Sequence, residues 1–349
     1  MISKAEAKKR VLFVGGGGVG SIGALNLELG GLAEVTLALR SNYKTVVEKG
    51  YDITSCDHGR VEGWRPTHVL DHIPNILSES LPPYDYIVLA TKNIPDIPPT
   101  LSSLLFPAVT PSHTAIVLIQ NGLNIEKPLL EAFPTNCVLS GISFIGAHET
   151  RHGVIEQADV DRLSIGAFRN PNLIREDEEA VAREFVRIYG AGGKTDCVYE
   201  ADVPYQRWRK LIYNTCLNSI CAITGMDTGR IQLQPRLLTT IVRPAMEEVR
   251  LAALSCGIAL PLDIADTMIA ADAIDMYGAP SMLVDIQKGN FIEVENLLGE
   301  PLREGRARGV EMGTVGWLYE VCGALQWRER DRRGMVERPE RREYASVGR

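Results

Sequence analysis

The sequence predicts an α/β fold: an N-terminal, mostly parallel sheet with helices on both faces, followed by an all-helical C-terminal domain. Two observations predict this arrangement. Short apolar runs, typical of buried strands, alternate with helical patterns in the first part of the chain. Such alternation is typical of parallel strands joined by crossover helices. Beyond about residue 203 nearly every segment is helical in pattern.

The first strand is read from "RVLFV", and a glycine turn and a helix follow it directly. Further strands are expected at 33–40, 84–92 and 114–122, with a helix opened by proline at 94–109. The runs 138–149, 153–159 and 162–168 are expected to be shorter antiparallel strands that extend the same sheet. The glycine-rich segment 189–203 is the natural boundary between the domains. Helices are expected after it at 204–224, 236–256, 261–276, 280–287 and 290–308.

Composition indicates a globular protein of 349 residues with a formal net charge of −7. That charge argues against nucleic acid as a partner, since phosphate binding needs concentrated Lys and Arg. The seven cysteines form no CxxC pair, which favours reduced thiols and a cytoplasmic location. No apolar run approaches membrane-spanning length, so no membrane partner is expected. The arginine-rich stretch 327–349 is expected to be a charged, flexible tail, with a partner-binding tail as the alternative.

The glycines after the first strand predict a dinucleotide site. Gly15, Gly17 and Gly20 fit GxGxxG, and Gly18 lies within the same turn. This pattern allows a tight turn, a close approach of pyrophosphate to the backbone and close packing of helix on strand. The start of the helix then offers unpaired N–H groups to the phosphates. Because the turn lies between a strand and a helix, a Rossmann-type domain over residues 1–200 is preferred to a purely structural turn.

The second strand indicates which cofactor is bound. It ends at Arg40, with no acidic residue nearby to hold ribose hydroxyls. An arginine at this place suits the additional phosphate of NADP, although a solvated arginine at a strand end is the alternative. Lys92 and Asn121 lie at the carboxyl ends of the next two expected strands, where ligands of such sheets gather.

A polar stripe interrupts the apolar helix expected at 204–224. Lys210, Asn214 and Asn218 recur at steps of four and would share one helix face. All six histidines lie within the first 152 residues, so a proton donor in the helical region must be another residue. A lysine on a partly apolar helix is a candidate because desolvation lowers its pKa towards neutrality. Two neutral amides could orient a carbonyl or hydroxyl without neutralising the lysine.

Two further motifs have plain structural interpretations. "HETRH" (residues 148–152) matches the zinc motif HExxH, but it lies between strand-like runs and is interpreted as a hairpin connection, with no metal site. Ser281 follows a proline and could cap a helix. Glu293 and Glu295 lie among apolar residues of an expected helix and could belong to a solvated face.

Taken together, these motifs resemble the ketopantoate reductase (2-dehydropantoate 2-reductase) family over about residues 10–325. The resemblance rests on the GxGxxG, "TK" at 91–92, "QNG" at 120–122, K-x3-N-x3-N at 210–218, and Ser281 with Glu293 twelve residues later. It implies NADPH in a cleft between a Rossmann-type domain and a helical substrate domain at 201–326, and hydride transfer to a 2-keto acid. It also implies the role of each site residue: Lys210 as general acid, Glu293 in the closed catalytic site, Asn121, Asn214, Asn218 and Ser281 on the substrate, and Gly15, Gly17, Gly18, Gly20, Arg40, Lys92 and Asn121 at the cofactor.

Gly278 and Thr228 stand where the family pattern has asparagine. Ketopantoate, with a role in pantothenate biosynthesis, is therefore the first expected substrate, and a different ketone or imine is the alternative. A non-catalytic NADP-binding redox sensor is a third interpretation, against which the retained Lys210, Asn214 and Asn218 count. The expected partner is a small keto substrate, and a homodimer is the candidate assembly.

Overall fold

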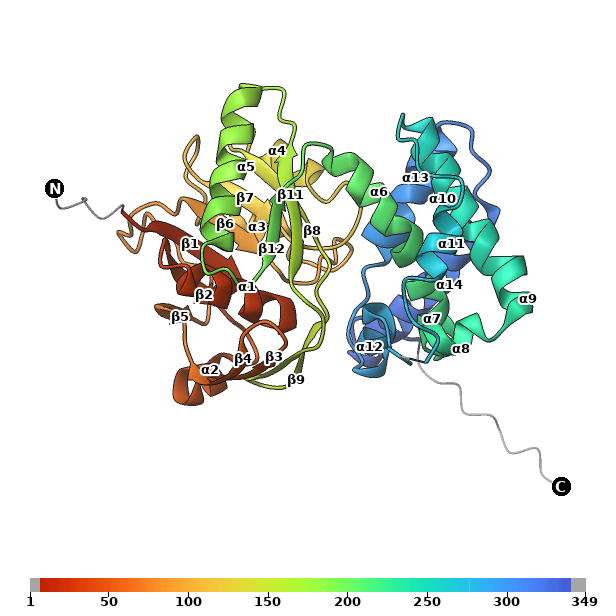
Figure 1. The fold of residues 1–349 in the computed structure, drawn as a ribbon, viewed down its shortest axis with the longest axis horizontal. Coiled ribbons are helices and arrows are strands. Elements are labelled where there is room, and N and C mark those ends of the chain that lie inside the picture. Colours follow the sequence, from red (N-terminus) through yellow and green to blue (C-terminus); the bar gives the residue numbers. More distant parts are fainter. Residues whose placement is uncertain (1–6, 276, 340–349) are drawn as a thin grey trace.

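The computed structural model describes residues 7–275 and 277–339, and in it a sheet domain lies beside a helical domain (Figure 1). The strands are β1 (Lys9–Val14), β2 (Ala33–Ala38), β3 (Tyr51–Ser55), β4 (Gly59–Trp64), β5 (His68–Leu70), β6 (Tyr86–Leu89), β7 (Ala115–Leu118), β8 (Val138–Ser143), β9 (Ala147–Arg151), β10 (Val154–Gln157), β11 (Arg162–Phe168) and β12 (Asp196–Tyr199). The helices among these strands are α1 (Gly18–Leu29), α2 (Tyr43–Lys49), α3 (Leu101–Leu105), α4 (Lys127–Ala132) and α5 (Arg175–Gly190).

The C-terminal domain contains helices and three π-helical turns, labelled η. In chain order these are α6 (Val203–Tyr213), η1 (Asn214–Asn218), α7 (Ser219–Thr224), α8 (Thr228–Gln232), α9 (Pro235–Leu237), η2 (Leu238–Val242), α10 (Arg243–Ser255), α11 (Ile264–Ile269), α12 (Ser281–Gln287), η3 (Glu295–Gly299), α13 (Glu300–Ala307) and α14 (Gly313–Arg332). The predicted fold class is therefore confirmed. In the described ranges, no helix combines the length and the apolar character needed to cross a membrane.

The main sheet has the strand order β12-β11-β8-β7-β6-β1-β2-β5. The strands from β5 to β8 run parallel, whereas β11 is antiparallel to β8 and parallel to β12. In β1, Val11 and Phe13 belong to one apolar core, while Leu12 and Val14 belong to the core on the opposite face. Both faces are covered, which explains why the strands read as continuous apolar runs rather than as alternating patterns.

The prediction for residues 138–168 is partly wrong. β8 and β11 extend the main sheet as expected, although β8 pairs in parallel with β7. β9 and β10 instead form a hairpin in a separate sheet with the order β4-β3-β10-β9. Sequence patterns identify strands but not their partners, and residues 51–64, which supply β3 and β4, were not predicted to be strands.

Two helical predictions also need correction. The helix expected at 94–109 is only α3, because prolines at 95, 98 and 99 delay its start until Thr100 caps it by accepting a hydrogen bond from the Ser103 N–H (3.4 Å). The helix expected at 261–276 is only Ile264–Ile269, with residue 276 outside the described ranges. The helices α2, α4, α5, α8 and α14 were not predicted.

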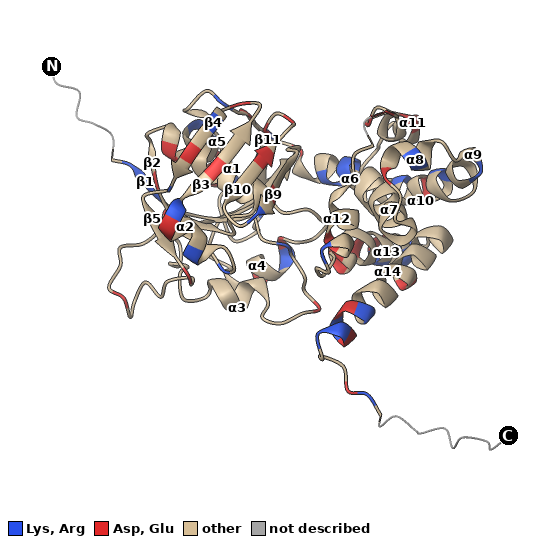
Figure 2. Cartoon of the chain, turned by 90° about the horizontal axis from the view of Figure 1, so that it is seen from below, with Lys and Arg blue, Asp and Glu red and all other residues tan. Residues whose placement is uncertain are grey.

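The flexible tail expected after Gln326 is helical at its start, because α14 continues to Arg332. Buried Glu329 accepts a hydrogen bond from Arg333 Nε (2.8 Å) and lies 3.7 Å from Arg332 Nη1. These pairs, three and four residues apart, support the last turns of the helix. Figure 2 shows that acidic and basic residues alternate along the ribbon at this end of α14. Residues 340–349 of the expected tail lie outside the described residues.

Candidate active site

The glycine turn joins β1 to α1 in the conformation that its sequence requires. Gly15 has a φ of +97°, which disfavours any residue with a side chain. A Cβ on Gly20 would lie 1.9 Å from the Gly15 carbonyl oxygen, so this position must also be glycine for the turn to close. A Cβ on exposed Gly17 would meet no atom within 4 Å. The start of α1 is thus open at Gly17, which fits the pyrophosphate of a dinucleotide.

The carbonyl of Gly16 is held from outside the turn. Tyr51 Oη donates to it (2.8 Å), and so does Asn42 Nδ2 (3.0 Å). Asn42 Nδ2 also donates to Glu149 Oε1 (2.9 Å), the glutamate of "HETRH". The motif lies on the β9–β10 hairpin rather than on a helix, as expected, and its glutamate supports the glycine turn. Sequence analysis missed this contribution of Asn42 and Tyr51, because the contacts join segments that are distant in the chain.

Gly18 and Arg40 are the two other predicted cofactor residues of this region. A Cβ on Gly18 would lie 2.2 Å from the carbonyl oxygen of Ala147 in β9, so hairpin packing is sufficient to require glycine there. Arg40 lies two residues beyond β2 and is exposed. Arg40 thus lies at the carboxyl end of its strand, the edge of the sheet at which ligands of such folds gather.

The loops after β6 and β7 carry the two polar residues predicted for the cleft. Gln120 Nε2 donates to the carbonyl oxygen (2.7 Å) and to Oγ1 (3.1 Å) of Thr91, which ties the two loops together. Gly122 has a φ of +117°, and Leu123 N donates to the Asn296 carbonyl of the helical domain (2.9 Å). Asn121 is therefore held where the sheet domain meets the helical domain.

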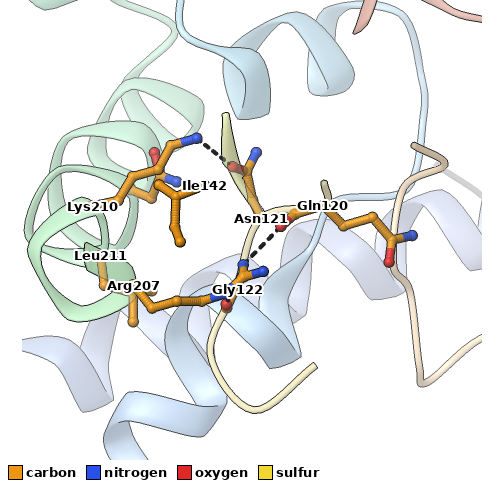
Figure 3. Close-up of a pocket in the computed structure, with 8 residues that line it drawn as sticks. Gln120, Asn121, Gly122, Ile142, Arg207, Lys210 and Leu211 are labelled. Atoms are coloured by element: carbon orange, nitrogen blue, oxygen red, sulfur yellow. Dashed lines mark hydrogen bonds between the residues drawn. The ribbon is translucent and has the colours of Figure 1, made fainter. Parts of the chain in front are cut away.

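Lys210 lies on α6 and reaches across to this loop. Its Nζ donates to Asn121 Oδ1 (2.8 Å; Figure 3). Nζ also donates to the carbonyl of Ser143 at the end of β8. It also lies 5.0 Å from the ring centroid of Phe144. Lys210, Asn121 and Asn214 line one small pocket.

The surroundings of Lys210 bring its titration close to neutral pH. Burial of the ammonium is the largest effect and, together with the positive charges of Arg207 and Lys92, lowers the pKa of Lys210 to about 7. The carboxylate of Glu293 opposes this shift. A lysine with such a pKa can both donate and regain a proton near pH 7.

The amides of the polar stripe are buried and paired with each other. Asn218 Nδ2 donates to Asn214 Oδ1 (3.1 Å), so the two share one face, as the spacing predicts. The backbone from Asn214 to Asn218 is nevertheless π-helical, a local irregularity that often occurs at functional sites. Asn218 Oδ1 is buried and has no partner among the described residues. A buried acceptor without a donor is costly, which fits a site completed by a ligand hydroxyl or N–H.

A second group of charged side chains surrounds Lys92. Its Nζ lies 2.7 Å from Asp285 Oδ2 and 3.5 Å from Glu293 Oε2. Burial disfavours the ammonium, but the carboxylates of Glu293 and Asp285 outweigh that effect and raise the pKa of Lys92. Burial is also the main cause that raises the pKa of Glu293, which accepts from the Asn93 N–H (3.1 Å). Lys92 is thus paired with the helical domain, a contact that the sequence did not predict.

Other residues singled out in the sequence lie in different settings. Glu293 comes just before η3 rather than within a helix from residue 290. Ser281 is the first residue of α12 and is exposed; Pro280 occupies the cap position, and Ser281 makes no side-chain hydrogen bond within the described part of the chain. Thr228 is buried at the start of α8, whereas a Cβ on Gly278 would meet open space.

Comparisons with known proteins agree with this geometry. A family model described as "Ketopantoate reductase PanE/ApbA" matches residues 11–170, and its C-terminal counterpart matches residues 202–326. An uncharacterized protein of Saccharomyces cerevisiae is 36% identical, with coverage of 94% of this chain and 96% of the relative.

Solved structures show the same architecture. The 2-dehydropantoate 2-reductase of Methylococcus capsulatus is 30% identical and superimposes with a TM-score of 0.76, covering 92% of this chain and 97% of that chain. D-mandelate dehydrogenase, solved with NADH and anilino(oxo)acetate, is 18% identical with a TM-score of 0.77, covering 92% and 99% of the two chains. The second likeness concerns the fold alone.

Proposed function

The chain belongs to the ketopantoate reductase family of nicotinamide-dependent oxidoreductases, and from this membership we propose that it reduces a 2-keto acid to a 2-hydroxy acid with NADPH. The first candidate substrate is 2-dehydropantoate (ketopantoate), with pantoate as the product and pantothenate biosynthesis as the setting. Residues 1–200 would bind the cofactor and residues 201–326 the substrate. The observation that carries the proposal is the Lys210 ammonium, which bonds Asn121 of the opposite domain.

The cofactor residues in this proposal are Gly15, Gly17, Gly18, Gly20, Arg40, Lys92 and Asn121. The open face at Gly17 would admit the pyrophosphate, and the exposed Arg40 would pair with the additional phosphate that distinguishes NADPH from NADH. When bound, the cofactor would supply the hydride to the keto carbon. Lys92 would have to share its charge between the cofactor phosphates and its present partners, Asp285 and Glu293.

Lys210 would supply the proton. As the keto carbon gains the hydride, its oxygen gains negative charge, and the Lys210 ammonium donates a proton to that oxygen to form the hydroxyl. The neutral amine then regains a proton from solvent. The pKa of about 7 supports this cycle, because both protonation states are accessible near neutral pH.

The amides and Ser281 would hold the substrate. Asn214 lines the same pocket as Lys210, and the unpartnered Oδ1 of Asn218 is available to a ligand donor. Asn121 would keep the lysine directed at the keto oxygen, while Ser281 at the start of α12 would meet the carboxylate. Glu293 would hold Lys92 in place within the closed site, close enough to influence the charge of Lys210.

A different ketone or imine is the second candidate substrate, supported by Gly278 and Thr228. Neither residue offers an amide, and the space above Gly278 is open, so the same proton donor could face a bulkier or less polar substrate. A redox sensor without turnover is less well supported, since a sensor needs no lysine titrating near neutrality. The homodimer remains the expected assembly, which sedimentation of the purified protein would measure.

The deciding experiment follows oxidation of NADPH, with NADH in parallel, by the purified wild type and Lys210→Ala. Ketopantoate and a series of bulkier 2-keto acids serve as substrates. Turnover of ketopantoate with NADPH, reduced about 100-fold to 10,000-fold in the variant without loss of NADPH binding, is the expected result. Turnover of bulkier acids alone would move the assignment to the second candidate. Equal turnover in wild type and Lys210→Ala would refute the role of the lysine.

A further inference from the structure

Arg207 is a buried cation in the centre of the candidate site that neither the motifs nor the proposed reaction uses. It lies on α6, one helical turn before Lys210, and its side chain is 6% exposed. Its Nε lies 2.9 Å from Oε1 of Glu126, which is also buried, and donates to Ser140 Oγ (2.7 Å). Burying a guanidinium costs desolvation free energy, which its hydrogen bonds and ion pair must offset. The partners of Arg207 therefore indicate what it contributes to the site.

Two of the contacts of Arg207 are with the residues that flank Asn121. Arg207 Nη1 donates to the carbonyl oxygens of Gln120 (2.8 Å) and Gly122 (3.1 Å), the residues on either side of Asn121 (Figure 3). Nη2 donates to the Gly141 carbonyl in β8 (3.3 Å). One planar group thus fixes the loop against the helix that carries Lys210, and a lysine has no comparable fork of donors.

We infer that Arg207 is a positioning residue, which holds Asn121 at hydrogen-bond distance from Lys210 and so fixes the proton donor relative to the substrate. The inference rests on the proposed roles of Lys210 and Asn121. Glu126 acts as the counter-ion that keeps the guanidinium in place. A displacement of about 1 Å in such a constellation can reduce turnover by about 100-fold.

Arg207 also influences the charge of Lys210. The charged groups that act on Lys210 are Arg207 on its own helix, Lys92 from the loop after β6 and Glu293 ahead of η3. Loss of the Arg207 cation removes a repulsion, so the pKa of Lys210 should rise in an Arg207→Gln variant. A residue that only stabilises the fold would lower the amount of active protein without this shift.

The test uses the full-length protein and Arg207→Gln, with Arg209→Gln as a matched control on the same helix. Arg209 makes no hydrogen bond or ion pair in the described ranges. The first readout is the pH dependence of acylation of Lys210 by an amine-reactive reagent, followed by mass spectrometry, which needs no substrate. The second is kcat with the keto acid, and the third is NADPH affinity by fluorescence.

Arg207→Gln should raise the apparent pKa of Lys210 above about 7 and lower kcat roughly 10-fold to 100-fold, with NADPH affinity within about twofold of wild type. If that variant does not fold, Arg207→Met with Glu126→Leu replaces the buried pair by apolar side chains, a change that proteins often tolerate. A smaller rise in the pKa of Lys210 is then expected, because the counter-ion is removed together with the cation. A Lys210 pKa equal to that of Arg209→Gln would overturn the inference. Because the labelling needs no turnover, an absence of keto-acid reduction would refute the proposed function without deciding the role of Arg207.

Discussion

Lys210 is half-buried between two oxygens, one from Asn121 and one from Ser143, and no carboxylate of residues 7–275 or 277–339 bonds it directly. An aspartate at the position of Asn121 would hold the ammonium in its charged form and raise its pKa. The neutral amide orients the ammonium and leaves burial free to lower the pKa to about 7. A neutral amide at position 121 therefore allows the pKa of Lys210 to lie near neutrality.

The pH dependence of the wild type follows from this pKa. Keto reduction requires protonated Lys210, so kcat/KM should be steady below pH 7 and should fall about tenfold for each pH unit well above it. Initial rates of NADPH oxidation between pH 5.5 and 9.5 would show this alkaline limb. A rate that keeps rising with pH in this range would contradict Lys210 as the acid.

Arg40 should determine the choice of cofactor. Arg40→Ala should raise the KM for NADPH about 10-fold to 100-fold, because a charge-assisted pair with the additional phosphate is lost, and should leave NADH unaffected. Lys49→Ala, at the C-terminal end of α2, is the control for the loss of one positive charge from the sheet domain. Equal changes in the KM for NADPH and NADH in Arg40→Ala would show that Arg40 is a solvated residue at a strand end and does not select the cofactor.

The glycine turn combines glycines required by packing with one that packing leaves free. Gly20 closes against Gly15, and Gly18 approaches the β9–β10 hairpin, whereas Gly17 faces open space. The GxGxxG pattern alone cannot separate these causes. The two causes differ in the atoms that a Cβ at each glycine would meet.

Substitutions in the turn should therefore divide into two classes. The free energy of unfolding of Gly17→Ala should lie within about 0.5 kcal/mol of the wild-type value. Its affinity for NADPH should nevertheless be at least about tenfold lower. Gly20→Ala should lower the free energy of unfolding by roughly 1–3 kcal/mol, because its Cβ would overlap the Gly15 carbonyl. Urea denaturation and NADPH titration of both variants would measure this. If Gly17→Ala binds NADPH with wild-type affinity, the pyrophosphate does not bind at Gly17.

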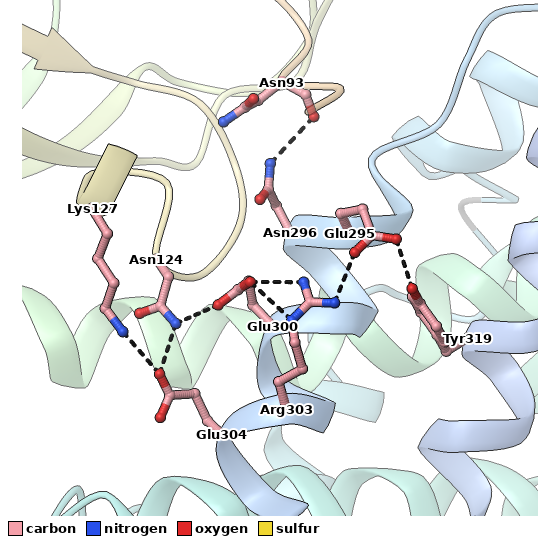
Figure 4. Close-up of polar contacts among 9 residues, drawn as sticks. All are labelled: Asn93, Asn124, Lys127, Glu295, Asn296, Glu300, Arg303, Glu304 and Tyr319. Atoms are coloured by element: carbon pink, nitrogen blue, oxygen red, sulfur yellow. Dashed lines mark hydrogen bonds and ion pairs between the residues drawn. The ribbon is translucent and has the colours of Figure 1, made fainter. Parts of the chain in front are cut away.

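The two domains are also joined by polar contacts around Glu300 and Glu304 (Figure 4). Asn124 Nδ2 donates to Glu300 Oε2 (2.6 Å) and Glu304 Oε1 (2.8 Å), and Lys127 Nζ lies 2.9 Å from Glu304 Oε1. Burial raises the pKa of Glu304, but bonds from Lys127, Asn124 and Arg308 outweigh it and lower that pKa to about 2. The stability contributed by Glu304 is therefore present above the pKa of an unfolded glutamate, about 4.5, and is lost as the pH falls towards 2.

Asn124 should matter more than Lys127 for the stability of the whole molecule. Asn124→Gly keeps the backbone relaxed at its φ of +57° but leaves two carboxylates without that donor, so it should lower the free energy of unfolding by roughly 1–3 kcal/mol. Lys127→Ala removes a half-exposed pair and should cost less than about 1 kcal/mol. Urea denaturation at pH 7 would measure both. A larger loss in Lys127→Ala would contradict this ranking.

The sequence by itself determined the features that depend on local pattern. Buried apolar runs marked β1, β2, β6 and β7, the glycines marked the turn into α1, and four-residue spacing placed Lys210, Asn214 and Asn218 together on one helical segment. These signals lie within a few residues of the structure they specify, so they can be recognised without knowing the fold.

Only the tertiary structure decided which distant segments meet. It paired β9 and β10 with β3 and β4, placed Glu149 of "HETRH" behind the glycine turn, and joined Lys92 to Asp285 and Glu293. It also brought the Arg207 guanidinium onto the carbonyls around Asn121. Nothing in the local pattern distinguishes Arg207 from Arg209, because a buried ion pair is defined by a partner eighty-one residues away, Glu126. Long-range pairing and burial are properties of the packed chain, and the pKa of Lys210 depends on both.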